Sequence, residues 1–160
     1  MAAKVQAIPD GYHTVTPYLS IKGAAAALDF YRRAFGAQEL YRLEMPDGRI
    51  GHAELQIGSS RLMLADEMPE MPDAVTKSPA TLGGTTNGYR LYVEHVDADF
   101  ERAVAAGAKV KRVVANQFYG DRSGTVEDPF GHLWTISTHV EDVSPEEMQK
   151  RMAEMMKQPC

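Results

Sequence analysis

Charged and titratable side chains in this chain are spaced so that some of them could act together on a small molecule. His52 and Glu54 are separated by one residue, and alternate residues of a β-strand share one face. A histidine beside a carboxylate can form an acid–base pair, because imidazole changes its charge near neutral pH. The same two side chains could also be ligands of a displaced metal site, or a solvated pair at the rim of a sheet.

Further charged residues would add to such a site. Arg90 and Glu94 could anchor a ligand, or they could form a structural ion pair with each other. Arg122 lies in a predicted loop after Phe118, where it could close over a ligand or pair with Asp121 to fix the loop. The sequence leaves these alternatives open.

The composition of the chain limits the classes of protein to which it can belong. The chain has 160 residues, 44% of them hydrophobic and 24% charged, which is typical of one soluble globular domain. The formal net charge of −5, with no basic cluster beyond Lys109–Arg112, argues against nucleic acid and anionic membrane as partners. No apolar run approaches the ~20 residues that span a bilayer. The first residues lack an apolar signal core, so we expect a cytoplasmic protein.

Two stretches of the chain have the same predicted order of elements, and these elements must position the charged side chains named above. Residues 18–40 and 89–111 each predict a short strand, a loop, an amphipathic helix and a Gly-Ala step into another strand. Such a repeat indicates two modules that arose by duplication. Two half-sites facing each other would form a concave site, which favours small-molecule binding.

The predicted elements of module one, residues 12–67, follow from alternation, helical spacing and turn residues. They are strands His13–Ile21, Gln38–Glu44, Ile50–Ile57 and Arg61–Ala65, and helix Ala24–Phe35. Residues 68–87 contain three prolines and predict a linker or a lid with no element.

Module two, residues 88–142, repeats the pattern. Its predicted elements are helix Ala98–Ala106 with Asp97 as N-cap, and strands Tyr89–Glu94, Lys109–Val114, Thr125–Glu127 and Leu133–Thr138. Residues 143–160 predict a C-terminal helical tail with Ser144 as N-cap and Glu147 completing a capping box. The fold class is therefore α+β, with two tandem βαβββ modules and a C-terminal helix.

Three motifs carry a resemblance to a known family. ALDFYRRAFGA (27–37), VDADFERAVAAGAKV (96–110) and EDPFGHLW (127–134) together resemble the vicinal-oxygen-chelate superfamily of glyoxalase I, bleomycin-resistance proteins and extradiol dioxygenases. The FYGDRSG…DPFGHLW stretch looks most like its PhnB-like branch. The resemblance covers residues 12–142 as a single domain. It implies that two curved mixed sheets form a cup, usually completed in a homodimer.

The resemblance also implies where a metal would bind. Metal-dependent members carry four His or Glu ligands, and the motifs place those positions at Thr16, Met63, Gly88 and Thr135. Hydroxyl groups, a thioether and a glycine cannot replace imidazole or carboxylate around a divalent transition metal. We therefore expect no metal and no other cofactor at the usual site.

Strand alternation then predicts which side chains line the cup. Leu55 should face a helix, which leaves its neighbours His52 and Glu54 in the cup as the candidate catalytic residues. Trp134 should be core, and Asp128 should cap backbone amides in its turn. The candidate ligand-binding residues are Thr16, Tyr18, Gln56, Arg61, Met63, Arg90, Tyr92, Glu94, Phe118, Arg122 and Thr135.

These expectations favour a metal-independent, homodimeric protein that holds a polar or aromatic small-molecule ligand in the cup. The alternative is a glyoxalase-type lyase or isomerase acting next to a carbonyl, with His52 and Glu54 as base or as a relocated metal site. A third hypothesis is an interaction module whose methionine-rich tail docks a partner.

Overall fold

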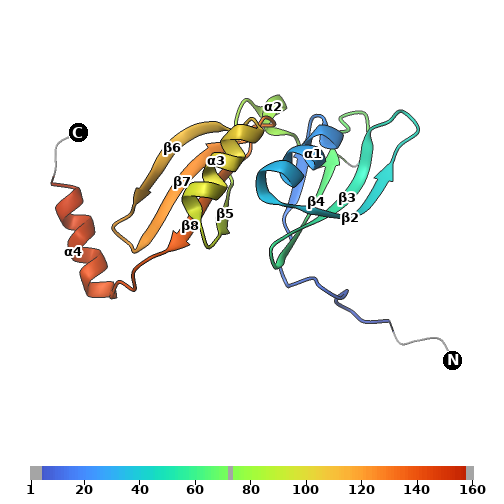
Figure 1. The fold of residues 1–160 in the computed structure, drawn as a ribbon. Helices are drawn as coiled ribbons and strands as arrows, with labels where there is room; N and C mark the ends of the chain where they lie inside the picture. Colours follow the sequence, from blue (N-terminus) through green and yellow to red (C-terminus); the bar gives the residue numbers. More distant parts are fainter. Residues whose placement is uncertain (1–4, 72–73, 158–160) are drawn as a thin grey trace. The chain divides into compact units, whose positions relative to one another are not determined.

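Each half of the chain folds into a four-stranded sheet with one long helix against one of its faces (Figure 1). The computed structural model describes residues 5–71 and 74–157. A first compact unit ends at Thr85 and a second begins at Thr86. The α+β class and the two βαβββ modules are confirmed.

Unit 1 contains β1 (Tyr18–Ile21), α1 (Ala24–Phe35), β2 (Gln38–Glu44), β3 (Ile50–Ile57), β4 (Ser60–Asp66) and a short α2 (Pro79–Leu82). Its sheet, sheet 1, has the strand order β1-β4-β3-β2. β1 runs parallel to β4, whereas the other two pairs are antiparallel.

Unit 2 contains β5 (Gly88–Tyr92), α3 (Val96–Ala106), β6 (Lys109–Asn116), β7 (Asp121–Glu127), β8 (Leu133–His139) and α4 (Pro145–Met155). Its sheet, sheet 2, has the order β5-β8-β7-β6, with β5 parallel to β8. The strand order repeats that of sheet 1, as a duplication requires.

The helices bury the apolar sides that their spacing predicted. Tyr31 and Phe35 of α1 are buried, and α1 ends at Gly36. In unit 2, Phe100 of α3 packs so closely on Gly124 that a Cβ there would lie 2.6 Å from the Phe100 ring. Trp134 is 1% exposed, which confirms it as core.

The first predicted strand is wrong in its first half, since β1 begins only at Tyr18. Pro17 has no N–H to donate, and pairing with β4 starts where its carbonyl accepts from Met63 N at 2.9 Å. Glu94 also falls outside its predicted strand, because β5 ends at Tyr92.

The start of α3 differs from the prediction as well. Asp97 is not the N-cap, because α3 begins at Val96 and His95 precedes it without a side-chain cap. Val96 N donates instead to Thr138 Oγ1 at 3.1 Å, across 42 residues of sequence. Asp97 binds Arg122. The distant partners therefore decide where the helix starts.

The segment between the modules does contain an element, contrary to the prediction for residues 68–87. Ser78 is buried and its hydroxyl accepts from Thr81 N at 3.3 Å, which caps α2. Glu67 accepts from the hydroxyls of both residues, at 2.7 Å and 2.6 Å. Residues 72 and 73 of this segment lie outside the described part.

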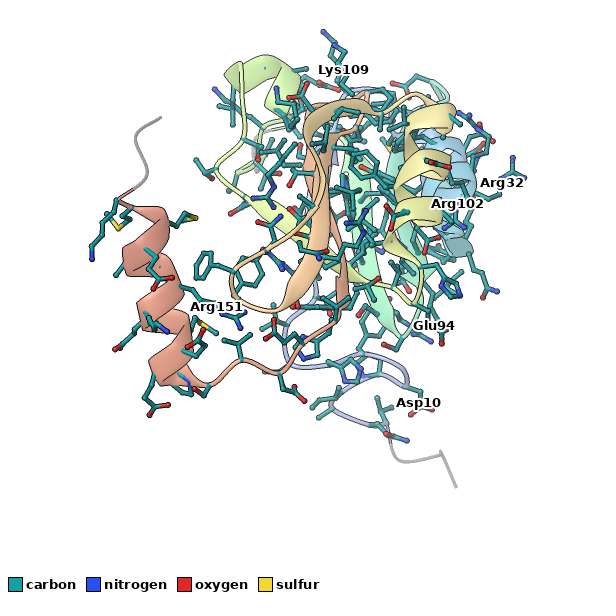
Figure 2. The ribbon with its side chains drawn as sticks, turned by 60° about the vertical axis from the view of Figure 1, so that its left-hand side comes forward. Asp10, Arg32, Glu94, Arg102, Lys109 and Arg151 are labelled. Carbon is teal, nitrogen blue, oxygen red and sulfur yellow. The ribbon has the colours of Figure 1, made fainter. Side chains whose placement is uncertain are left out.

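The C-terminal helix is confirmed as α4, up to Met155. Ser144 caps it by accepting from Glu147 N at 3.2 Å. The helix has no buried residue, and Arg151 points from it toward the rest of the unit, where it binds Glu141 and the Phe118 carbonyl (Figure 2). Within the described residues no helix is long and apolar enough to cross a membrane.

Candidate functional site

The helix-free face of each sheet carries most of the predicted site residues, and we call these the open faces. On β3, Ala53 and Leu55 are buried beneath α1, whereas His52, Glu54 and Gln56 alternate with them and stay partly exposed. The predicted orientation of this strand is confirmed.

On the open face of sheet 1, four side chains form a hydrogen-bonded chain. Tyr18 Oη lies 3.0 Å from His52 Nδ1, and His52 Nε2 lies 3.4 Å from Glu54 Oε1. Tyr12 Oη donates to the other carboxylate oxygen of Glu54. A histidine held between a phenol and a carboxylate can take up or release a proton at either ring nitrogen.

The segment before β1 lies over this open face, which sequence analysis missed. Arg61 Nη1 donates to the carbonyl of Asp10 at 2.7 Å, and the Arg61 guanidinium lies 4.7 Å from the centre of the Tyr12 ring. Figure 2 shows Asp10 on this segment. Gly11 has φ of +80°, and a side chain there would overlap the Arg61 guanidinium. No pattern in the sequence links Tyr12 with Glu54.

The same contacts shift the protonation of the site. The hydrogen bond from Tyr12 is the main cause that holds the pKa of Glu54 below its ordinary value, although partial burial opposes it. Burial, and then the bond to Glu54, raises the pKa of Tyr12, and burial raises the pKa of Tyr18. Near neutral pH, Glu54 is therefore an ionised acceptor, and both phenols are protonated.

Replacing Tyr12 with phenylalanine should raise the pKa of Glu54, because the donor that stabilises its carboxylate is lost. A folded-state pKa below the unfolded value stabilises the fold above that unfolded value, and this contribution disappears as pH falls through the folded pKa. The stability difference between wild type and variant should therefore shrink on acidification. Carbon-detected NMR titration of Glu54 measures the pKa directly, and an unchanged value would contradict the proposed donor.

On the open face of sheet 2, Asp121 is the acceptor that joins three side chains. Its side chain is 4% exposed and accepts from Arg90 Nη1 at 2.9 Å, Tyr92 Oη at 2.9 Å and His139 Nδ1 at 3.0 Å. Asp142 and then Asp121 raise the pKa of His139. Of the two alternatives left open for Arg90 and Glu94, the structural ion pair is not formed, because Arg90 pairs with Asp121. The predicted loop position of Asp121 is wrong, because β7 begins at this residue.

Tyr119 completes this cluster. Arg90 Nη2 lies 3.4 Å from Tyr119 Oη, and the guanidinium lies 5.6 Å from the ring centre. Burial alone would raise the pKa of Tyr119, but bonds with Ser123 and Arg90 and the charges of Arg90 and Arg112 bring it below its ordinary value. The Phe118 ring meets the Tyr119 ring edge-on at 5.2 Å. Arg90 therefore sits among acceptors and aromatic surfaces.

Two predicted residues lie away from both open faces. Arg122 alternates with Asp121 on β7, so it points to the α3 side, where its Nη2 binds Asp97 Oδ1 at 2.6 Å. Glu94 lies in the loop before α3 (Figure 2). Both line a shallow depression of about 450 Å³ at the start of α3. Their roles in ligand binding remain predictions, but they belong to a different surface.

The other predicted residues keep to the expected strands, with one exception. Met63 pairs with Glu54, and Thr135 pairs with Arg90, each on its open face. Gln56 folds back and donates to the Gly58 carbonyl at 3.1 Å. Thr16 lies before β1 and is not part of a strand. The sequence missed Tyr12, Tyr119, Asp121 and His139 as members of the site.

The residues at the implied metal positions do not fit a metal. Met63 lies directly opposite Tyr18, and Thr135 opposite Arg90, so Thr16 and Gly88 are each two residues before these partners. A thioether, two hydroxyls and a glycine supply no imidazole or carboxylate. In the described part of the chain, no three His, Cys, Asp or Glu side chains form a group that could hold a metal ion.

Comparison with known proteins gives consistent matches. The profile of the Glyoxalase/Bleomycin resistance protein/Dioxygenase superfamily matches residues 12–136. An uncharacterized protein of Mycobacterium bovis is 43% identical over 139 residues, which span 87% of this chain and 91% of that protein. The crystal structure of TioX from Micromonospora is similar, with a TM-score of 0.61, 27% identity, and coverage of 81% of this chain and 100% of TioX. The PhnB protein from Bacillus cereus has a TM-score of 0.60 and 16% identity, covering 79% of this chain and 99% of that protein, which shows the fold alone.

Proposed function

Because this chain belongs to the glyoxalase/bleomycin resistance protein/dioxygenase superfamily, we propose that it binds a small polar or aromatic molecule on its open faces, without a metal ion. One observation carries the proposal. Both open faces present aromatic rings and hydrogen-bonding groups, while the residues at the implied ligand positions cannot hold a metal. The resemblance inferred from three sequence motifs is confirmed by the family match.

An unsatisfied donor on sheet 1 supports this proposal. Arg61 Nε is buried and has no hydrogen-bond partner among the described residues. A buried donor without an acceptor costs free energy, so a ligand oxygen placed there would be favoured. Tyr12, Tyr18 and His52 offer flat surfaces and further polar atoms on the same face.

Thermal unfolding in the presence of a panel of small aromatic and polar compounds tests the proposal. A compound that binds only the folded state at about 100 times its Kd adds about 2.7 kcal/mol of apparent stability. The binding hypothesis expects such stabilisation with the compound recovered unchanged. A panel that produced no shift would count heavily against it. Tightly held nickel, zinc or manganese at one ion per chain would overturn the metal-free part.

A second candidate is a glyoxalase-type lyase or isomerase, favoured by the hydrogen-bonded chain through His52. In that case His52→Ala should abolish turnover with little loss of stability, because this side chain is at the surface of the open face. His95→Ala is the matched control, since His95 is exposed and caps nothing. An activity that survives in His52→Ala would remove His52 as the base.

We further propose that the protein works in the cytoplasm as a homodimer and binds no nucleic acid. The net charge of −5 supports the last point, since nucleic-acid binding relies on clustered basic residues. The dimer rests on the family resemblance. A solution mass of a single 17.7 kDa chain would contradict it.

A further inference from the structure

One row of residues across the open face of sheet 2 has its own chemistry. Arg90 on β5 lies opposite Thr135 on β8, Thr135 lies opposite Thr125 on β7, and Thr125 lies opposite Arg112 on β6. Residues directly opposite in neighbouring strands project from the same face. The row, which we call the arginine–threonine row, thus has a guanidinium group at each end and two hydroxyls between, and the guanidinium of Arg90 is paired with Asp121. The threonine Oγ1 atoms are 3.0 Å apart.

Tyr119 lies over this face beside Arg90, whose guanidinium is 5.6 Å from the centre of its ring. Its hydroxyl is 3.5 Å from Ser123 Oγ, on the same side of β7 as Thr125. The charges of both Arg90 and Arg112 act on the phenol and favour its ionised form. The effect of Arg112 agrees with its position opposite Thr125 in the row.

Arg112 is available to a ligand. The neighbouring Lys111 forms an ion pair with Glu127 at 3.1 Å. In the described part of the chain no carboxylate lies within ion-pair distance of Arg112, and its side chain is on an exposed residue. Arg90 is held by Asp121, Ser137 and Tyr119 through its two terminal nitrogens. A guanidinium has five N–H groups, so Arg90 keeps donors beyond these contacts.

The corresponding row of sheet 1 has the opposite character. There the residues in register are Tyr18, Met63, Glu54 and Tyr41. The two modules have equivalent rows of four residues, but the charges of the rows differ. Sheet 1 has the carboxylate of Glu54 at the position where sheet 2 has Thr125. A preference for anions therefore belongs to sheet 2.

We propose that the arginine–threonine row binds an elongated organic dianion, with one anionic group at each arginine and the middle of the molecule over the threonine hydroxyls. Three strand spacings of about 4.8 Å place the Cα atoms of Arg90 and Arg112 about 14 Å apart. Long arginine side chains can close that span on a molecule the size of one benzene ring with two carboxylates. Arginine matches carboxylate and phosphate with paired hydrogen bonds. This inference rests on the proposed function and names the class of its ligand.

The test compares three probes of one shape on the full chain: terephthalate with two carboxylates, benzoate with one, and neutral benzamide. Affinities come from NMR titration of backbone amides. Terephthalate should bind at least tenfold more tightly than benzoate, benzamide should be weakest, and the amide signals of Thr125 and Thr135 should shift. Arg112→Gln should weaken terephthalate about tenfold, to the level of benzoate.

Arg102→Gln is the matched control, because it removes the same charge from the other side of unit 2, where Arg102 pairs with Asp99 on α3 (Figure 2). Its affinity for terephthalate should equal that of wild type. Equal binding of all three probes would overturn the dianion inference while small-molecule binding stands. Unchanged terephthalate binding by Arg112→Gln, signal shifts confined to sheet 1, or no binding of any probe would also overturn it. In the last case the compound panel decides separately on the proposed function.

Discussion

Replacing Asp128 with alanine is expected to lower the free energy of unfolding by about 3–5 kcal/mol. The Asp128 side chain is fully buried in the turn before β8. One carboxylate oxygen accepts from Phe130 N and His132 N, each at 2.9 Å, and the other accepts from Trp134 Nε1 at 2.9 Å. Alanine would remove the acceptor of three donors, two of which form buried hydrogen bonds, and would leave a cavity beside the core tryptophan.

Asp128→Asn keeps the volume of the side chain, so it measures the contribution of charge and hydrogen bonding to stability without creating a cavity. In one orientation its amide nitrogen would face the donor of Trp134, and in the other it would face the two backbone donors. No orientation satisfies all three donors, so we expect a clear loss, smaller than that of alanine. Urea unfolding followed by fluorescence measures both, because Trp134 is the single tryptophan of the chain. Asp142→Asn, on a fully exposed side chain, is the control, and it is compared above the pKa of His139, where the bond between Asp142 and His139 carries no charge on the imidazole. An asparagine variant as stable as wild type would show that the carboxylate is not needed.

The parts of the fold that depend on local signals could be predicted from the sequence. Helix α1 has the predicted bounds, because apolar residues recur at helical spacing up to Gly36. Strands β2 and β3 also have their predicted bounds, since the Pro46-Asp47-Gly48 turn separates them. The role of Asp128 follows from the tendency of aspartate to bind backbone amides in its own turn.

The predictions were wrong where a residue distant in sequence determines the bounds of an element. The start of α3 depends on Thr138, and Asp97 is taken by Arg122, 25 residues away in sequence. Strand β7 begins at Asp121, four residues before the prediction, because it pairs with β8 up to His139. Local propensity does not contain these partners.

The sequence was enough to predict which face of the sheet the site residues lie on, but not which side chains they bind. Alternation placed His52 and Glu54 on one face, but it extended β5 to Glu94 and so offered Glu94 as a possible partner of Arg90, which pairs with Asp121 instead. The sequence does contain a pattern that points to Asp121 as the partner of Arg90. If residues 52 and 54 are aligned with 123 and 125 through the repeat, the polar alternation continues back to Asp121. Nothing comparable points to Tyr12, because a segment outside the strands brings it to Glu54.

Asp121 contributes both to the stability of the fold and to the candidate site. Its replacement by alanine should lower the free energy of unfolding by about 2–4 kcal/mol. Its almost fully buried carboxylate accepts from Arg90, Tyr92 and His139, and loss of the acceptor leaves these donors and the Arg90 charge without compensation. Arg90 should become mobile, so terephthalate binding should weaken together with stability. Urea unfolding and the NMR titration measure the two effects on the same variant.

Asp121→Asn tests the charge alone, through His139. The raised pKa of His139 comes first from Asp142 and then from Asp121, so the asparagine variant should lower it in part and Asp142→Asn should lower it more. A folded-state pKa above the unfolded value stabilises the fold below the unfolded pKa, and the contribution is lost as pH rises through the folded pKa. The stability difference between wild type and Asp121→Asn should thus be larger at low than at high pH. A His139 titration that Asp121→Asn leaves unchanged would contradict this role and would mean that the Asp121 carboxylate stabilises only Arg90 and Tyr92.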